Sequence, residues 1–343
     1  MRGGSSKGVF VREADLPPPG PARDALILRL MGSPDPMQLD GLGGTHSSTS
    51  KVVAMAPGGA AGCDARYLFA QVGVERAVVD YAGNCGNLTA AAALYAIQAG
   101  WAQGGGVTLL NDNTRKVVRA AFDHMSARPG GACDLRLTFL DPAGAVTGRL
   151  LPTGNLKDRV VASEGRSLEV SILDVSGAVC FARAEDLGFA EDVAPAAVNG
   201  DGARLELLES VRVAAGRLIG GVSAGSPRLV LVAAPRRHRL ADGRWLASGD
   251  HDLLVRAMSM QRMHHACPFT ALQCAAVAAM IPGTMAAEAA GPLAGPHVRI
   301  AHPKGVGGAA VEPAVGGLVS GVAAVTVRRS ARRLLDGRFH LDG

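Results

Sequence analysis

Two short helices that are apolar on nearly every face limit the folds open to this chain more than any other feature of its sequence. The first is predicted over the alanine-rich run from Ala90 to Gly100, and the second runs from Ala271 to Ile281. A helix without a polar face has to be buried. At roughly 12 residues, each run is also too short to span a bilayer. The sequence therefore predicts a globular protein with helices inside its domains.

A single cysteine stands before the first of these helices, in the segment Gly83-Asn84-Cys85-Gly86-Asn87. The first N–H groups of a helix lack partners within the helix, and the helix dipole is positive at this end. Both features stabilise a thiolate and attract an anion. We therefore expect Cys85 to be a reactive thiol beside an anion-binding site. The alternative is a small buried hydrophobic side chain, the usual role of a free cysteine.

A second polar segment, from Asp40 to Ser50, is rich in Gly, Ser and Thr and precedes a strand predicted to begin at Lys51. Its hydroxyl and N–H groups, including those of Ser47 and Ser48, are typical of an anion-binding loop. It is not a nucleotide-binding loop, because Ser50 stands where a glycine should precede the lysine. The alternative is a solvated turn followed by a surface lysine.

The bulk composition describes a compact globular protein. With 343 residues, 48% hydrophobic and 19% charged, the chain is long enough for two domains with full cores. No uninterrupted apolar run reaches about 18 residues, so we expect no membrane segment. The N-terminal residues lack the apolar core of a signal peptide, which makes a cytoplasmic location the expectation. The net charge of +5 comes from scattered arginines with few Tyr and Trp, which argues against nucleic-acid binding.

The six cysteines are widely spaced and include no C-x-x-C pair, which argues against a disulfide framework and a zinc ribbon. One cluster, formed by His264, His265, Cys267 and Cys274, contains potential metal ligands. We interpret these as ordinary residues at the start of a buried helix. No metal site is therefore expected.

The two halves of the chain repeat one order of elements. Each has β structure, a turn of small or polar residues, a threonine (Thr89 or Thr270) and a short Ala-rich helix. An internal duplication is the simplest account. We expect an N-terminal domain of residues 1–165, completed by 325–343, and a C-terminal domain of residues 166–324, with Val160 to Ser167 as the crossover.

Several motifs resemble, in order, those of the 2-methylaconitate cis–trans isomerase (PrpF) family, which has the diaminopimelate epimerase fold. They are Met1-Arg2-Gly3-Gly4-Ser5-Ser6-Lys7-Gly8, Asp40-Gly41-Leu42-Gly43-Gly44, Ser47-Ser48-Thr49-Ser50-Lys51, Gly83-Asn84-Cys85-Gly86-Asn87-Leu88-Thr89, Leu151-Pro152-Thr153-Gly154-Asn155, Met263-His264-His265-Ala266, His302-Pro303 and Arg329-Ser330-Ala331-Arg332. The resemblance implies an α/β (α+β) fold of two pseudo-symmetric domains, each a β-sheet or barrel wrapped around a central buried helix.

The resemblance also implies a function and a site. The expected activity is cofactor-independent isomerisation of an unsaturated tricarboxylic acid, 2-methylaconitate or aconitate, by cis–trans or allylic double-bond isomerisation. Alternatives within the class are a 4-oxalomesaconate tautomerase and a 3-methylitaconate isomerase, and from another class a non-catalytic tricarboxylate-binding protein. The catalytic pair falls on Lys51 and Cys85. The expected substrate-binding residues are Ser5, Ser47, Ser48, Gly86, Asn87, Thr270 and His302.

In the expected mechanism, one residue of the catalytic pair removes an allylic proton and the resulting anion is reprotonated. The sequence does not say which residue is the base. Spacing from Thr270 makes Ala266 the counterpart of Cys85 in the second half, so Cys267 is given no catalytic role. A small-molecule substrate is the expected partner, and a homodimer is a possible assembly.

Overall fold

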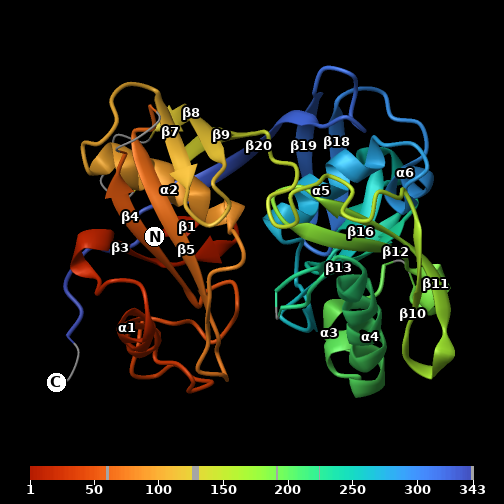
Figure 1. Cartoon of the computed structure of the whole chain (residues 1–343), viewed down its shortest axis with the longest axis horizontal. Helices are drawn as coiled ribbons and strands as arrows, with labels where there is room; N and C mark the ends of the chain where they lie inside the picture. Colours follow the sequence, from red (N-terminus) through yellow and green to blue (C-terminus); the bar gives the residue numbers. More distant parts are fainter. Residues whose placement is uncertain (59–61, 126–130, 191, 224, 341–343) are drawn as a thin grey trace. The chain divides into compact units, whose positions relative to one another are not determined.

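The computed structural model describes residues 1–58, 62–125, 131–190, 192–223 and 225–340, and the chain forms two compact units (Figure 1). Unit 1 consists of Met1–Leu140 and Val327–Gly343, and unit 2 consists of Asp141–Thr326. The first boundary lies earlier than the expected position at residue 165. Residues 141–165 belong to unit 2 because they form hydrogen bonds with other residues of that unit. For example, the carboxylate of Asp174 accepts hydrogen bonds from the N–H groups of Val146 (2.8 Å) and Thr147 (2.6 Å).

The segment from Val160 to Ser167 does not cross between the units, so that expectation is wrong. Strand β10 (Asp158–Val161) pairs antiparallel with β11 (Ser167–Asp174), and Val161 lies opposite Ser167. Val160 and Leu168 are both buried in the core of unit 2. The segment is therefore a hairpin turn inside that unit.

Unit 1 is built around helix α2 (Gly86–Gln98). Its other elements are β1 (Arg2–Gly3), β2 (Ser6–Lys7), β3 (Val9–Arg12), the 3-10 helix η1 (Glu13–Asp15), α1 (Pro21–Met31), β4 (Lys51–Pro57), β5 (Ala65–Val72), β6 (Val79–Asp80), β7 (Gly106–Asn111), β8 (Val117–Met125), β9 (Cys133–Leu140) and the last part of β20 (Val322–Arg332).

The strands of unit 1 curve around α2. Strand β3 pairs parallel with β4, β4 antiparallel with β5, and β5 parallel with β7; β7–β8 and β8–β9 are antiparallel. Strand β20 pairs with both β9 and β1. Helix α2 packs against β1, β2, β4, β7 and β9, so strands from distant parts of the sheet enclose it (Figure 1). This enclosure explains why the helix has no polar face.

Unit 2 is built around helix α5 (Phe269–Ala279), in which every residue is buried. Its other elements are β10, the 3-10 helix η2 (Ser163–Gly165), β11, β12 (Ala178–Arg183), η3 (Glu185–Leu187), α3 (Pro195–Asn199), α4 (Gly202–Leu218), β13 (Arg228–Ala233), β14 (His238–Arg239), β15 (Trp245–Leu246), η4 (Ser248–Asp250), β16 (Leu253–Ser259), β17 (Arg262–Met263), α6 (Met285–Ala290), β18 (His297–His302), β19 (Gly305–Pro313) and the first part of β20.

The strand pairing of unit 2 repeats that of unit 1. Strand β12 pairs parallel with β13, β13 antiparallel with β16, and β16 parallel with β18; β18–β19 and β19–β20 are antiparallel. Helix α5 connects β16 to β18 as α2 connects β5 to β7. This repeated order is the pattern that an internal duplication predicts.

Some elements differ from the expectation. Strand β19 and helix α6 were not predicted from the sequence. Strand β19 contains three glycines (Gly305, Gly307 and Gly308), a composition that disfavours strands. It forms because β18 and β20 hydrogen-bond to its two edges.

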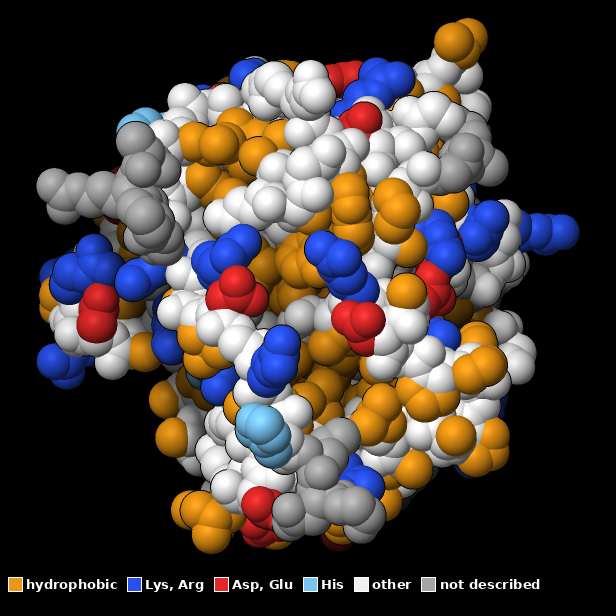
Figure 2. Space-filling view, turned by 90° about the vertical axis from the view of Figure 1, so that its left-hand side faces the viewer, with side chains coloured by type: hydrophobic (Ala, Val, Ile, Leu, Met, Phe, Trp, Pro, Cys, Tyr) orange, Lys and Arg blue, Asp and Glu red, His pale blue; other side chains and the backbone are white. Residues whose placement is uncertain are grey.

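The face shown in Figure 2 carries side chains of both charges. Lys and Arg side chains are scattered over it, Asp and Glu side chains lie beside some of them, and apolar side chains lie between. Within the part of the chain that the structure describes, no helix is both long enough and apolar enough to cross a membrane.

Candidate active site

Cys85 is the N-cap residue of the buried helix α2, and its side chain is half-buried. Its carbonyl oxygen accepts hydrogen bonds from the N–H groups of Leu88 (2.8 Å) and Thr89 (3.1 Å), which closes the first turn of the helix. Its Sγ lies 3.7 Å from Oγ of Ser6 in β2. The expected position of Cys85 at the start of a buried helix is confirmed, and its reactivity stays a prediction.

Lys51 is the first residue of β4, and only 8% of its surface is exposed. Its Nζ donates a hydrogen bond to Oε1 of Gln71, the residue directly opposite on β5. The same Nζ lies 5.1 Å from the centre of the Phe69 ring, within the range of a cation–π contact. The alternative of a solvated surface lysine is therefore wrong.

Gly8 brings the start of β4 close to the start of α2. A Cβ atom added at Gly8 would lie 2.7 Å from Cδ1 of Leu88 and 3.1 Å from the carbonyl oxygen of Lys51. A side chain here would have to displace the buried Leu88 side chain and would press on the backbone of Lys51, so glycine suits this position. The N–H group of the preceding residue, Lys7, donates to the carbonyl oxygen of Ser48 (3.0 Å). One short N-terminal segment therefore lies between Lys51 and the helix that begins after Cys85.

Two glutamines hold the loop that precedes Lys51. Gln71 Nε2 donates to the carbonyl oxygens of Ser47 and Ser50, each at 3.0 Å. Gln38, which is buried, donates through Nε2 to Ser50 Oγ (2.8 Å) and accepts at Oε1 from the N–H of Thr45 (2.9 Å). The loop is therefore fixed by side-chain amides as well as by backbone hydrogen bonds from Lys7 and Val72.

Asn87, the second residue of α2, uses its side-chain amide within unit 1. Its Nδ2 donates to the hydroxyl oxygens of Ser5 (3.1 Å) and Ser6 (3.4 Å), and its Oδ1 accepts from Nε of Arg329 in β20 (3.1 Å). Asn87 thus ties the turn between β1 and β2 and the last strand to the helix that begins after Cys85. Substrate binding by Ser5 and Asn87 stays a prediction.

The remaining predicted binding residues of unit 1 lie in the same region. Gly86 is the first residue of α2 and is buried. The Oγ of Ser48 lies 3.0 Å from Nδ1 of His46, and Ser48 is buried, whereas Ser47 is half-buried. Unit 1 therefore brings Ser5, Ser47, Ser48, Lys51, Cys85, Gly86 and Asn87 together around its N-terminal segment.

A buried polar network lies behind the loop that carries Cys85. The hydroxyl of Tyr67 accepts a hydrogen bond from Nδ2 of Asn111 (2.7 Å) and lies 2.8 Å from Oγ1 of Thr89. It also donates a long bond, 3.4 Å, to Oδ1 of Asn84. Burial raises the pKa of Tyr67 to about 12, so the hydroxyl stays protonated at neutral pH and remains a donor.

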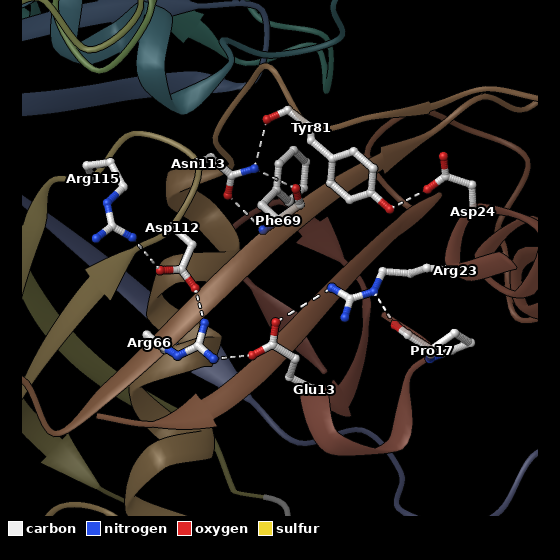
Figure 3. A network of polar contacts seen from close by, with 10 residues as sticks. All are labelled: Glu13, Pro17, Arg23, Asp24, Arg66, Phe69, Tyr81, Asp112, Asn113 and Arg115. Carbon is white, nitrogen blue, oxygen red and sulfur yellow. Dashed lines mark hydrogen bonds and ion pairs between the residues drawn. The ribbon is translucent and has the colours of Figure 1, made fainter. Parts of the chain in front are cut away.

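The turn after β7 supplies a second support, which Figure 3 shows. Asn113 Oδ1 accepts from the N–H of Phe69, and its Nδ2 donates to the carbonyl oxygens of Phe69 and Tyr81, all at 2.8 Å. The ring of Phe69 faces Lys51, and Tyr81 leads into the loop of Cys85. One amide therefore connects the supports of both predicted catalytic residues. A chain of ion pairs continues from this turn through Arg115, Asp112, Arg66, Glu13 and Arg23.

Two of the predicted binding residues belong to unit 2. Thr270 is the second residue of α5, and its Oγ1 accepts a hydrogen bond from Nη1 of Arg228 (2.9 Å). His302 ends β18, and its Nδ1 accepts from the N–H of Lys304 (3.2 Å). A Cβ at Gly307 would touch both Leu272 of α5 and His302, so His302 lies beside α5. Their roles in binding stay predictions.

Three neighbours of the predicted site were missed from the sequence: Ser6 beside the thiol, Gln71 beside Lys51, and Arg329 beside Asn87. Arg329 and Ser6 lie within the family motifs, but no local pattern distinguishes them from their neighbours. Gln71 becomes visible only when the register of β4 and β5 is known.

Two of the potential metal ligands, His264 and Cys274, form hydrogen bonds with backbone groups. His264 Nδ1 accepts from the N–H of Ala266 (3.0 Å), and Cys274 Sγ donates to the carbonyl oxygen of Leu173 (3.6 Å). Among the residues that the structure describes, no three His, Cys, Asp or Glu side chains are grouped so as to hold a metal ion.

The fold defines the class of the protein. The structure matches the crystal structure of a methylitaconate-delta-isomerase with a TM-score of 0.76, at 34% identity and covering 97% of this chain and 92% of that one. A probable proline racemase from Agrobacterium radiobacter shares the fold, with a TM-score of 0.55 at 11% identity over 94% of this chain and 83% of that one. The expected diaminopimelate epimerase-like α/β fold is thereby confirmed.

Within this class, the chain belongs to the PrpF family, because the family model described as PrpF protein matches residues 1–342. It is 36% identical to a 2-methyl-aconitate isomerase of Shewanella oneidensis, covering 98% of this chain and 94% of that protein. It is 34% identical to a 3-methylitaconate isomerase of Eubacterium barkeri (100% and 96%) and 35% identical to a 4-oxalomesaconate tautomerase of Pseudomonas putida (98% and 93%). The protein is an isomerase of the PrpF family.

Proposed function

We propose that this isomerase acts on an unsaturated tricarboxylic acid of the 2-methylaconitate or aconitate type, and that Lys51 and Cys85 transfer the proton. The observation that carries the proposal is their placement in unit 1. Lys51 is buried at the start of β4, and Cys85 caps the start of α2; Gly8 lets these two elements approach each other closely through the contacts that it allows with Lys51 and Leu88. The names of the relatives support the choice of substrate class.

The reaction that we propose needs no second reactant. One of the two residues takes a proton from the allylic carbon as the C–H bond breaks, and the electron pair spreads through the double bond into the neighbouring carboxylate. A new C–H bond then forms at the far carbon, or at the same carbon after rotation, with a proton from the enzyme. No atom is oxidised or reduced, so the expected absence of a cofactor is consistent with this chemistry.

The largest free-energy cost in this reaction comes from the extra negative charge that builds up on the carboxylate. N–H groups in the first turn of α2, at Gly86 and Asn87, point toward the end of the helix where Cys85 stands. Preorganised donors of this kind stabilise a developing anion without having to rearrange during the reaction. The helix dipole acts in the same direction.

Experiment has to choose among the unsaturated acids for which the relatives are named, of which 3-methylitaconate has two carboxylates and the others have three. Relatives named for 2-methyl-aconitate, 3-methylitaconate and 4-oxalomesaconate match this chain at 34–36% identity and nearly full length. A 3-methylitaconate isomerase and a 4-oxalomesaconate tautomerase are therefore the alternative activities that we consider.

The test is proton NMR of the purified protein in D2O with trans-aconitate, 2-methylaconitate, 3-methylitaconate and 4-oxalomesaconate. We expect one acid to be converted, with deuterium entering the allylic position. Cys85→Ser and Lys51→Met should each lower kcat by about a hundredfold or more, since acid–base groups contribute at least this much.

A protein that binds these acids without converting any of them would contradict the proposal and favour a non-catalytic tricarboxylate-binding protein. Two further expectations are tested separately: fractionation of the source cells checks the cytoplasmic location, and light scattering checks for a homodimer.

A further inference from the structure

Gln71 contacts both Lys51 and the loop before it. Its Oε1 accepts the hydrogen bond of Lys51 Nζ, and its Nε2 donates to the carbonyl oxygens of Ser47 and Ser50. It lies opposite Lys51 in the antiparallel register of β4 and β5. The side chain therefore connects the buried lysine to the serine loop through a single amide.

The partners of Gln71 fix the orientation of this amide. Backbone carbonyl oxygens only accept hydrogen bonds, so Ser47 and Ser50 require the NH2 end of the amide. The oxygen end is then the one that faces Lys51. A flipped amide would place oxygen against two carbonyl oxygens and NH2 against the lysine nitrogen.

A neutral acceptor suits a lysine that has to change its charge. A carboxylate at the same place would favour the ammonium form, because opposite charges stabilise each other in a partly buried site. An apolar side chain would leave the nitrogen without this acceptor. An amide oxygen accepts a hydrogen bond from either an ammonium or a neutral amine, and so holds the nitrogen in both states.

We propose that Gln71 is a positioning residue for the isomerisation: its amide oxygen holds Lys51 Nζ in place for proton transfer, and its amide nitrogen holds the loop of Ser47 and Ser50. This inference rests on the proposed function, in which Lys51 transfers the proton. Gln71 acts through Lys51 and the loop.

The test compares Gln71→Glu and Gln71→Leu with Gln38→Glu, which makes the same chemical change in the residue that holds the other side of the loop. The chain has five lysines, so the Cε resonance of Lys51 can be followed by NMR with 13C-labelled lysine and assigned from Lys51→Met. This titration needs no substrate. The profile of kcat/KM from about pH 6 to about pH 10 is measured in parallel.

We expect Gln71→Glu to raise the titration midpoint of Lys51 by about one pH unit or more, because a nearby carboxylate favours the ammonium form. The limb of the kcat/KM profile that depends on Lys51 should move in the same direction, whether this residue is the acid or the base. Gln71→Leu should lower kcat about tenfold to a hundredfold with a smaller change in KM. Gln38→Glu should move neither the midpoint nor the limb.

An unchanged midpoint in Gln71→Glu, or equal shifts in Gln71→Glu and Gln38→Glu, overturns the inference. If Gln71→Glu does not fold, an unchanged kcat in Gln71→Leu overturns it instead. If the midpoint moves as expected but the wild-type protein isomerises none of the acids, the proposed function fails. The role of Gln71 in the reaction then fails with it, although its contact with Lys51 stands.

Discussion

Tyr67 shows how a residue outside the predicted site holds that site in place. Its hydroxyl is buried and contacts side chains of Asn84, Thr89 and Asn111. Asn84 precedes Cys85, and Thr89 bonds through its N–H to the carbonyl oxygen of Cys85. The hydroxyl therefore connects the end of β7 to both sides of the cysteine.

Tyr67→Phe should destabilise the protein by about 1–3 kcal/mol, because it leaves the buried Nδ2 of Asn111 without its acceptor. Urea unfolding followed by circular dichroism measures the change. Tyr95→Phe is the matched control, since no hydrogen bond joins the hydroxyl of Tyr95 to any residue that the structure describes. Equal losses in the two variants would contradict the role given to the Tyr67 hydroxyl.

The predicted catalytic pair could be found from the sequence, but the residues that support it could not. Cys85 and Lys51 each stand next to a distinctive local pattern, a glycine-rich turn before an apolar helix and a serine loop before a strand. Gln71 contacts Lys51 from the neighbouring strand, and Tyr67 contacts Asn84 and Thr89 near Cys85. Such contacts depend on which residues lie opposite each other in neighbouring strands. A single sequence does not specify this register residue by residue.

At the scale of elements, small side chains let strands approach helix α2 closely. Ala90, Ala91, Ala92 and Ala93 are completely buried, and a Cβ added at Gly3 of β1 would lie 2.0 Å from the carbonyl oxygen of Asn87. Helix α2 and strand β1 therefore meet almost backbone to backbone. The apolar pattern of the sequence predicted the burial, and the tight packing explains the choice of alanine.

Ala92→Leu should destabilise unit 1 by about 1–3 kcal/mol, because the larger side chain has no space inside the curved sheet. Urea unfolding measures the loss. The matched control is Ala203→Leu at the exposed start of α4, where the added side chain meets solvent. A stable, fully active Ala92→Leu protein would show that α2 is packed more loosely than described.

A second element-scale feature is a pair of histidines in unit 2. His238 of β14 and His251, which follows η4, are both buried, with ring centroids 5.3 Å apart in an edge-to-face arrangement. Burial lowers the pKa of His251 below its usual value near 6.5. The charges of His238 and Arg299 lower the pKa further, whereas the backbone of Ala247 and the charge of Asp250 raise it.

This lowered pKa predicts a loss of stability on acidification. Below about pH 6.5 the unfolded chain protonates His251 while the folded chain resists it, so stability falls as the pH falls, by at most about 1.4 kcal/mol per pH unit. His251→Phe should flatten the fall in melting temperature between about pH 7 and pH 5. His124→Asn, at an exposed histidine of β8, should not. Parallel curves for the wild type and His251→Phe would rule out this contribution.

At the scale of the whole molecule, the internal repeat was predicted from the sequence, but the boundary between the two units was not. The two apolar helices revealed the duplication because burial on every face is visible in composition alone. Residues 141–165 join unit 2 through hydrogen bonds and a hairpin. Hydrogen bonds of this kind leave no pattern in the amino-acid composition from which they could be predicted.

Removing residues 327–343 should prevent unit 1 from folding, because β20 is the partner of both β1 and β9. Ending the chain after Arg333 is the control, since it keeps β20 complete and removes only the tail beyond it. Solubility and thermal unfolding of both truncated proteins check this. A folded unit 1 without residues 327–343 would mean that its sheet is stable with two open edges.

The late position of β20 also sets the order in which the protein can be completed during synthesis. The first 140 residues leave the ribosome without the strand that closes their sheet, and residues 141–326 must be made before it arrives. At ribosomal rates this delay is about 10 to 40 seconds. The half of the molecule that is made first, and that carries Lys51 and Cys85, is therefore the half that depends longest on protection from aggregation in the cell.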